Sequence, residues 1–134
     1  MKRSDVDKFE KLDAQLQGTY DEISLLSKKK PDDAVNKFKL GFINTLLAQA
    51  NDFLEQGYKP FIDFTLFDED NVPQNSDLAF ILSQYLQCLD KFRDDNLRWY
   101  HGERCWAINA EKGQKADENG FIYIKTFKPK RIKG

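Results

Sequence analysis

The sequence predicts a mainly α-helical protein, a three-helix antiparallel bundle with a β-hairpin at its C-terminal end. Two observations lead to this prediction. Apolar residues recur at three- and four-residue steps over three long segments, and the pattern changes to strand-like alternation near the C-terminus. The chain of 134 residues is long enough for one compact domain, which we expect to span residues 1–134.

The first predicted helix covers about residues 5–27. Ser4 can cap it, and Asp7 stands where a capping box needs an acidic or amide side chain. Its apolar residues form one stripe, with charged residues on the opposite face. Three members of the stripe are spaced by seven residues, the repeat of a coiled-coil seam: Phe9, Leu16 and Ile23.

The second predicted helix covers about residues 31–55. Pro31 suits the first helical position, and Asp32 and Asp33 suit the positive end of the helix dipole. Gly57 is a natural stop. Apolar residues cover a wider arc here than in the first helix, which is typical of a helix with neighbours on more than one side. We therefore expect this helix to be central.

The third predicted helix covers about residues 77–100, with Ser76 as its cap and Gly102 beyond its end. The three helices have similar lengths, which favours side-by-side packing. The link "KKKP" between the first two is short, so these two helices should form an antiparallel hairpin.

The β-hairpin is predicted over about residues 104–127, followed by a basic tail at 128–134. Trp106 and Ile108 would share one face of its first strand. Because a two-stranded hairpin is marginal alone in water, that face must rest on the helices or on another chain.

The link between the second and third helices contains an unusually apolar stretch at residues 61–67, in which five of seven residues are large and apolar. Three alternatives stay open: a third short strand, an extended segment packed across the end of the bundle, or an exposed strip that binds a partner. The last alternative makes these the candidate partner-binding residues: Phe61, Phe64, Phe67, Asp68, Glu69 and Asp70.

The sequence offers little for catalysis. His101 is the single histidine, and Gly102 argues against the continued helix that would bring His101 and Cys105 together as a metal pair. The sequence contains no C-x-x-C, H-E-x-x-H, G-x-G-x-x-G or Walker-type motif. We therefore expect no enzyme activity, no metal site and no cofactor.

The cysteine content and hydropathy favour the cytoplasm. Cys88 and Cys105 make no disulfide framework, and we expect free thiols in a reducing compartment. No apolar run is long enough for a membrane span, and "MKRSDVDKFEK" lacks the apolar stretch of a signal peptide. We expect no membrane association.

Charge is distributed unevenly along the chain. The formal net charge is −1, yet residues 125–134 contain five basic residues and no acidic one. Aromatic residues alternate with cations just before this end, the combination with which proteins hold single-stranded nucleic acid. The candidate nucleic-acid-binding residues are Arg98, Trp99, Tyr100, Arg104, Lys125, Lys128, Lys130 and Arg131. The other interpretation is that these rings attach the hairpin to the helices.

Three functional hypotheses follow. The first is a non-catalytic protein–protein interaction module, of the adaptor, assembly-factor or inhibitor type, that acts through its helical and apolar-link surfaces and forms a homodimer. The alternative is a nucleic-acid-binding accessory protein that uses the hairpin and tail. The third is an enzyme centred on His101.

Overall fold

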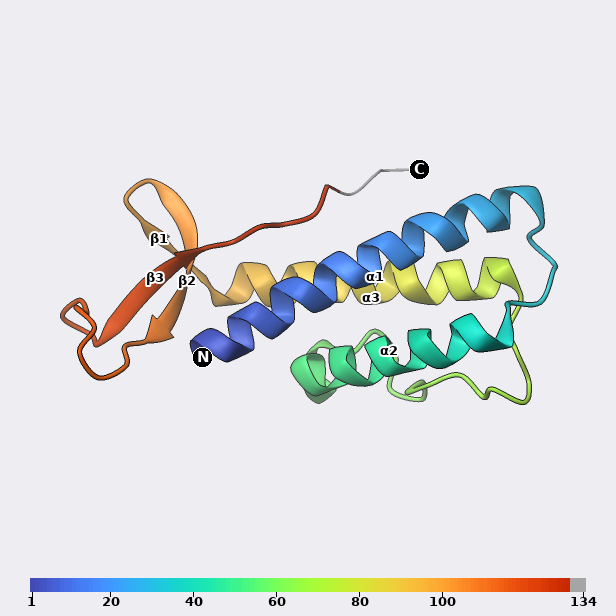
Figure 1. Ribbon diagram of the computed structural model, residues 1–134, viewed down its shortest axis with the longest axis horizontal. Coiled ribbons are helices and arrows are strands. Elements are labelled where there is room, and N and C mark those ends of the chain that lie inside the picture. The colour runs from blue at the N-terminus through green and yellow to red at the C-terminus, as the bar shows by residue number, and fades with distance from the viewer. Residues whose placement is uncertain (131–134) are drawn as a thin grey trace.

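The computed structural model contains three helices followed by a three-stranded antiparallel sheet (Figure 1), and the predicted mainly α fold with a minor β part is confirmed. It describes residues 1–130, without the side chain of Gln56. The helices are α1 (Arg3–Lys29), α2 (Lys37–Tyr58) and α3 (Asn75–Asn96). The sheet has the order β1 (Leu97–Tyr100), β2 (Glu103–Asn109), β3 (Phe121–Lys125).

Helix α1 is antiparallel to both other helices, whereas α2 and α3 run in the same direction (Figure 1). An isolated β-bridge between Ala34 and Gln74 joins the starts of α2 and α3. Next to it, the Val35 N–H donates to the Pro73 carbonyl at 2.9 Å. Because α2 and α3 are parallel, the link between them must return along the whole of α2, a distance of about 33 Å for a helix of 22 residues. This return explains the length of the link.

Helix α1 begins slightly earlier than predicted. Lys2 is at the N-cap position, and its backbone N–H donates to Asp5 Oδ2 at 3.0 Å. Asp5 therefore takes the place that the sequence analysis gave to Asp7, and Ser4 lies inside the helix. Residues near a helix start offer several competing polar side chains, so a boundary error of two residues is ordinary.

The predicted start of the second helix was wrong by six residues. Helix α2 begins at Lys37 rather than Pro31, and Asn36 caps it, since Asn36 Oδ1 accepts from the Lys39 N–H at 3.1 Å. The Pro31 carbonyl instead accepts from the Ser76 N–H at 3.1 Å. Backbone hydrogen bonds to the start of α3 thus hold this stretch in a turn, against its local preference for a helix start.

The predicted end of the third helix was wrong as well. Helix α3 ends at Asn96, and β1 follows at once and pairs antiparallel with β2. His101 and Gly102, with φ of 50° and 80°, form the two-residue turn between these strands, and both positive values match a type I′ hairpin turn. The sheet therefore has three strands rather than two, and its additional strand comes from the end of the predicted helix, not from residues 61–67.

Residues 61–67 contain no strand and run beside α2, whose side chains hydrogen-bond to the backbone of Thr65 and Phe67. The Asn44 side chain holds the Phe67 backbone at both ends: its Nδ2 donates to the Phe67 carbonyl at 2.9 Å, and its Oδ1 accepts from the Phe67 N–H at 3.0 Å. Phe64 and Phe67 are half-buried against the core. The stretch is therefore packed only in part, through Phe64 and Phe67, and it lies along a helix rather than across the end of the bundle. The other three large apolar residues remain exposed: Phe61, Ile62 and Leu66.

The core is centred on the ring of Phe9, which contacts Phe53, Phe92 and Trp106 with ring centroids 5.2 to 5.5 Å apart. Trp106 and Ile108 are buried, so the sheet rests on the helices through the predicted face. The three residues of the predicted seven-residue seam are buried too: Phe9, Leu16 and Ile23. None of the helices within residues 1–130 has the length and hydrophobicity needed to cross a membrane.

Candidate functional site

A groove of about 1090 Å³ lies between α1 and α2. Its walls extend from Met1 to Gln15 beside and along α1, and from Phe42 to Tyr58 along α2. At 1.5 Å per residue these stretches are roughly 20 to 25 Å long, or about four helical turns. The groove is thus an elongated channel between two antiparallel helices, which sequence reasoning did not predict.

The floor of the groove is apolar and largely aromatic. Leu46, Phe53, Tyr58 and Phe92 line it, and all four are half-buried against the core. The Phe53 and Tyr58 rings meet the Phe92 ring edge-on, with centroids 6.1 and 5.4 Å apart. Interlocking ring contacts of this kind hold the floor in one shape.

The two rims of the groove differ in charge, and the α1 side combines two lysines with the carboxylate of Asp5. Lys8 and Lys11 are exposed on the α1 side, and Asp52 and Glu55 are exposed on the α2 side. Helical geometry is interrupted at Glu55, whose φ of 45° lies in the left-handed region that favours glycine. The groove therefore combines an apolar floor with an acidic edge on α2 and an edge on α1 that is basic at Lys8 and Lys11.

An exposed aromatic pair continues this surface along α2. Phe38 is 75% exposed and Phe42 is 61% exposed, and their ring centroids are 5.0 Å apart. Phe42 is also part of the groove wall. Clustered large apolar side chains that stay in water are typical of interaction surfaces.

The candidate partner-binding residues of the link lie in different environments. Phe61 packs against Phe80 of α3 with ring centroids 6.0 Å apart. Phe64 and Phe67 are half-buried, as described above. Three of the six remain in solvent as an acidic turn: Asp68, Glu69 and Asp70. Part of this set therefore serves packing, and its role in binding a partner stays a prediction.

The candidate nucleic-acid-binding residues do not form one patch. Arg98 and Tyr100 lie on the outer face of the sheet, whereas Trp99 and Arg104, which are register partners, lie on the opposite face. The cause is the pleat of the strand, because successive side chains point to opposite sides. Arg104 is also engaged within the protein, since its Nη2 donates to the Asp94 carbonyl at 2.6 Å.

The outer face of the sheet carries a stacked pair of rings. Tyr100 and Tyr123 lie with centroids 4.2 Å apart and planes 9° from parallel. The Tyr123 hydroxyl donates to Asp117, and this hydrogen bond raises the pKa of Tyr123 and lowers that of Asp117. Lys125 is on the same face, because it is the register partner of Cys105, as is Arg98.

The remaining cations of the predicted set lie along or after β3. Lys125 Nζ is 3.3 Å from Glu103, and Lys128 Nζ is 3.7 Å from Asp90. Lys130 is exposed. Arg131 lies outside the described residues. Carboxylates thus face two of the cations, which reduces the positive charge that this end of the molecule offers to a polyanion.

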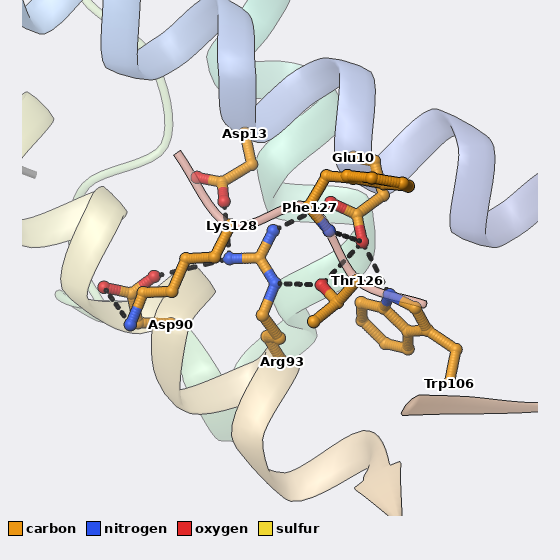
Figure 2. A network of polar contacts seen from close by, with 8 residues as sticks. All are labelled: Glu10, Asp13, Asp90, Arg93, Trp106, Thr126, Phe127 and Lys128. Atoms are coloured by element: carbon orange, nitrogen blue, oxygen red, sulfur yellow. Dashed lines mark hydrogen bonds and ion pairs between the residues drawn. The ribbon is translucent and has the colours of Figure 1, made fainter. Parts of the chain in front are cut away.

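A buried ionic network joins α1, α3 and the segment after β3 (Figure 2). Arg93 at its centre is 1% exposed. Its Nη1 lies 2.6 Å from Asp13 Oδ2, and its Nη2 lies 3.0 Å from Glu10 Oε2. Its Nε donates to Thr126 Oγ1 at 2.9 Å. Sequence analysis missed this network.

Glu10 connects the network to the sheet (Figure 2). Its Oε1 accepts from Trp106 Nε1 at 2.6 Å and from Thr126 Oγ1 at 2.7 Å, with the Phe127 N–H at 3.4 Å. The polar side chains of the network pair with one another, as they do where such a network stabilises a fold. The signal that could have revealed it is Arg93 itself, which follows Leu89 by four residues on the buried stripe of α3.

The residues considered for catalysis are apart from the groove. His101 is exposed in the turn between β1 and β2, and its ring meets the Tyr100 ring edge-on at 4.2 Å. Cys105 is buried, and burial raises the pKa of Cys88. Within residues 1–130, no three His, Cys, Asp or Glu side chains are grouped so that they could hold a metal ion.

Comparisons with known proteins add no functional assignment. No protein-family model matches the chain, and neither a curated protein nor a solved structure matches it. Function is therefore inferred from the groove, the sheet and the distribution of charge.

Proposed function

We propose that this protein is a non-catalytic protein–protein interaction module, of the adaptor, assembly-factor or inhibitor type, and that its partner binds the groove between α1 and α2. The observation that supports the proposal is the groove itself, where an apolar floor and the exposed Phe42 lie between charged rims. Protein interfaces share this anatomy of an aromatic centre within a polar edge.

Burial of the exposed rings would supply part of the binding free energy. Covering a phenylalanine side chain contributes about 1.5 to 3 kcal/mol relative to leaving it in water. Phe38 and Phe42 are both more than half exposed, so each has most of this contribution still to gain. A partner that covers Phe38, Phe42 and the floor of the groove gains more binding free energy than a partner that contacts a charged surface alone.

A second copy of the chain is one candidate partner, in line with the expected homodimer. Light scattering after size exclusion tests this, since a mass that stays near 15.7 kDa at all concentrations excludes a second copy. The expected compartment is the cytoplasm, which the two free thiols of Cys88 and Cys105 support.

Affinity capture from a nuclease-treated extract of the native host tests the proposal. We compare the full chain with Phe42→Lys, which places a charge in the groove wall, and with Ile62→Lys on the link, where the side chain is 92% exposed. We expect a protein that binds the wild type and Ile62→Lys but not Phe42→Lys. Loss with Ile62→Lys alone would move the site to the link, and equal capture by all three would contradict the proposal.

Nucleic-acid binding by the outer face of the sheet is a second candidate function, favoured by the stacked Tyr100 and Tyr123 rings with Arg98 and Lys125 on the same face. We rank it second because Glu103 pairs with Lys125. If it holds, labelled single strands bind at low salt, binding weakens steeply as salt is added, and Arg98→Glu with Lys125→Glu abolishes it. No binding at low salt would exclude it.

A further inference from the structure

The shape of the groove fits a rod. Its walls are two antiparallel helices, and about four turns of each contribute residues to it. A helix of about 14 residues is about 21 Å long and matches this length. A partner helix placed here would lie along both walls, parallel to one of them and antiparallel to the other (Figure 1).

The floor shows what such a helix would complete. Phe92 belongs to α3, so α3 lies beneath the groove. Helices α1 and α2 form the sides, and the fourth side is open. A helix in the groove would lie opposite α3 and convert the three helices into a four-helix arrangement with a closed apolar centre. Leu46 and Phe53, which are half-buried, would then be covered.

The rims specify the chemistry of the partner. Lys8 and Lys11 are three residues apart in a regular stretch of α1, so they project from neighbouring turns on one side of that helix. Asp52 and Glu55 both line the α2 side of the groove, and the helix is interrupted at Glu55. A partner helix would need acidic side chains on the flank beside Lys8 and Lys11, and basic side chains on the flank beside Asp52 and Glu55. The acidic rim also disfavours a nucleic-acid occupant in this groove.

We infer that the groove binds an amphipathic α-helix of about four turns whose apolar stripe is flanked by acidic residues on one side and basic residues on the other. This inference rests on the proposed function and names the class of segment that the partner presents. The apolar stripe would have residues at i, i+3 or i+4, and i+7, the spacing that keeps anchors on one helix face.

A displayed peptide library tests the inference directly on the full chain. Each peptide is a helix of about 15 residues with a fixed leucine stripe, and the flanking positions vary between Glu and Lys. We expect selected peptides to carry Glu along one flank and Lys along the other. Their affinities are then measured by fluorescence anisotropy with synthetic peptides.

Two variants assign the binding to the groove. Gln49→Trp introduces an indole at an exposed lining position and should weaken the selected peptides by about tenfold or more, whereas the matched control Ile62→Trp on the link should leave their affinity unchanged. Lys8→Glu with Lys11→Glu should weaken them about fivefold to tenfold and should make a new selection prefer Lys on both flanks. Circular dichroism checks that each variant is folded.

Three results would overturn the inference. The first is selection of peptides without flank asymmetry, and the second is binding that Gln49→Trp does not change. The third is a dimer that Gln49→Trp dissociates, which would make a second copy the occupant. These outcomes differ from failure of the proposed function, because host capture that depends on Phe42 would stand even if the captured segment is not a helix.

Discussion

The two sides of α1 meet their neighbours in contrasting ways. Towards α3 and the sheet, Asp13 and Arg93 are 0% and 1% exposed and form the centre of a closed ionic network. Towards α2, Lys8 and Lys11 remain in solvent along an open groove. The first interface is complete within the chain, whereas the second leaves apolar surface uncovered. The buried network and the proposed binding surface therefore lie on separate sides of one helix, and substitutions should separate their effects.

The largest effect is expected for Arg93→Met. Removing the cation leaves Glu10 and Asp13 without their buried partner, and breaking such a pair costs about 3 to 5 kcal/mol of unfolding free energy. Urea denaturation followed by tryptophan fluorescence measures the loss. Arg98→Met, on the exposed outer face of the sheet, is the matched control and should change stability by less than about 0.5 kcal/mol. Equal effects of the two substitutions would show that the network does not stabilise the fold.

Trp106→Phe should cost about 2 kcal/mol, because it removes the donor to Glu10 and leaves space in a fully buried position. The measurement is again the urea midpoint. Trp99→Phe is the matched control, since Trp99 is 72% exposed on the same strand pair. A larger loss for Trp99→Phe would contradict the placement of Trp106, rather than Trp99, in the core.

Alkaline pH should weaken the core at Tyr85. Burial raises the pKa of Tyr85 to about 12, and the ring is fully buried with its hydroxyl donating to Asn51 Oδ1. An unfolded tyrosine titrates near its ordinary pKa of about 10, so this contribution is complete below pH 10 and is lost as pH rises towards about 12.

Between pH 10 and pH 11 the loss should be about 1 kcal/mol. Urea denaturation at both pH values measures it. Tyr85→Phe should remove this part of the pH dependence, and an unchanged pH dependence in Tyr85→Phe would contradict the assignment to Tyr85.

The smallest effect on stability is expected in the groove. Gln49→Trp changes an exposed side chain, so the free energy of unfolding should stay within about 0.5 kcal/mol of wild type. The same variant should lose peptide binding, as described above. A loss of unfolding free energy as large as that of Arg93→Met would show that the groove wall also contributes to the stability of the fold.

Local periodicity made much of the fold predictable. The stripe containing Phe9, Leu16 and Ile23 predicted the buried face of α1, and alternation predicted that Trp106 and Ile108 seat the sheet. The errors arose where distant contacts prevailed over local preference. Pro31 suits a helix start, but its carbonyl is held by Ser76, which is 45 positions away.

The site was less predictable than the fold, because it depends on how whole helices are placed. The groove exists because α2 returns beside α1 while both pack on α3. Local sequence patterns do not predict this relative placement of the helices. The Arg93 network joins residues as far apart as Glu10 and Thr126, which are separated by 116 positions. The pleat of β1 places Trp99 on the opposite face from Arg98 and Tyr100. This separation could not be predicted while residues 97–100 were assigned to a helix.

Backbone NMR of the labelled full chain, titrated with the captured partner or a selected peptide, locates the binding surface residue by residue. We expect amide shift changes confined to the groove walls, at residues 8–15 of α1 and 42–55 of α2, with the amides of Arg93 and Thr126 unmoved. Shift changes centred on Tyr100 and Tyr123 of the sheet, with the groove walls unaffected, would contradict binding in the groove.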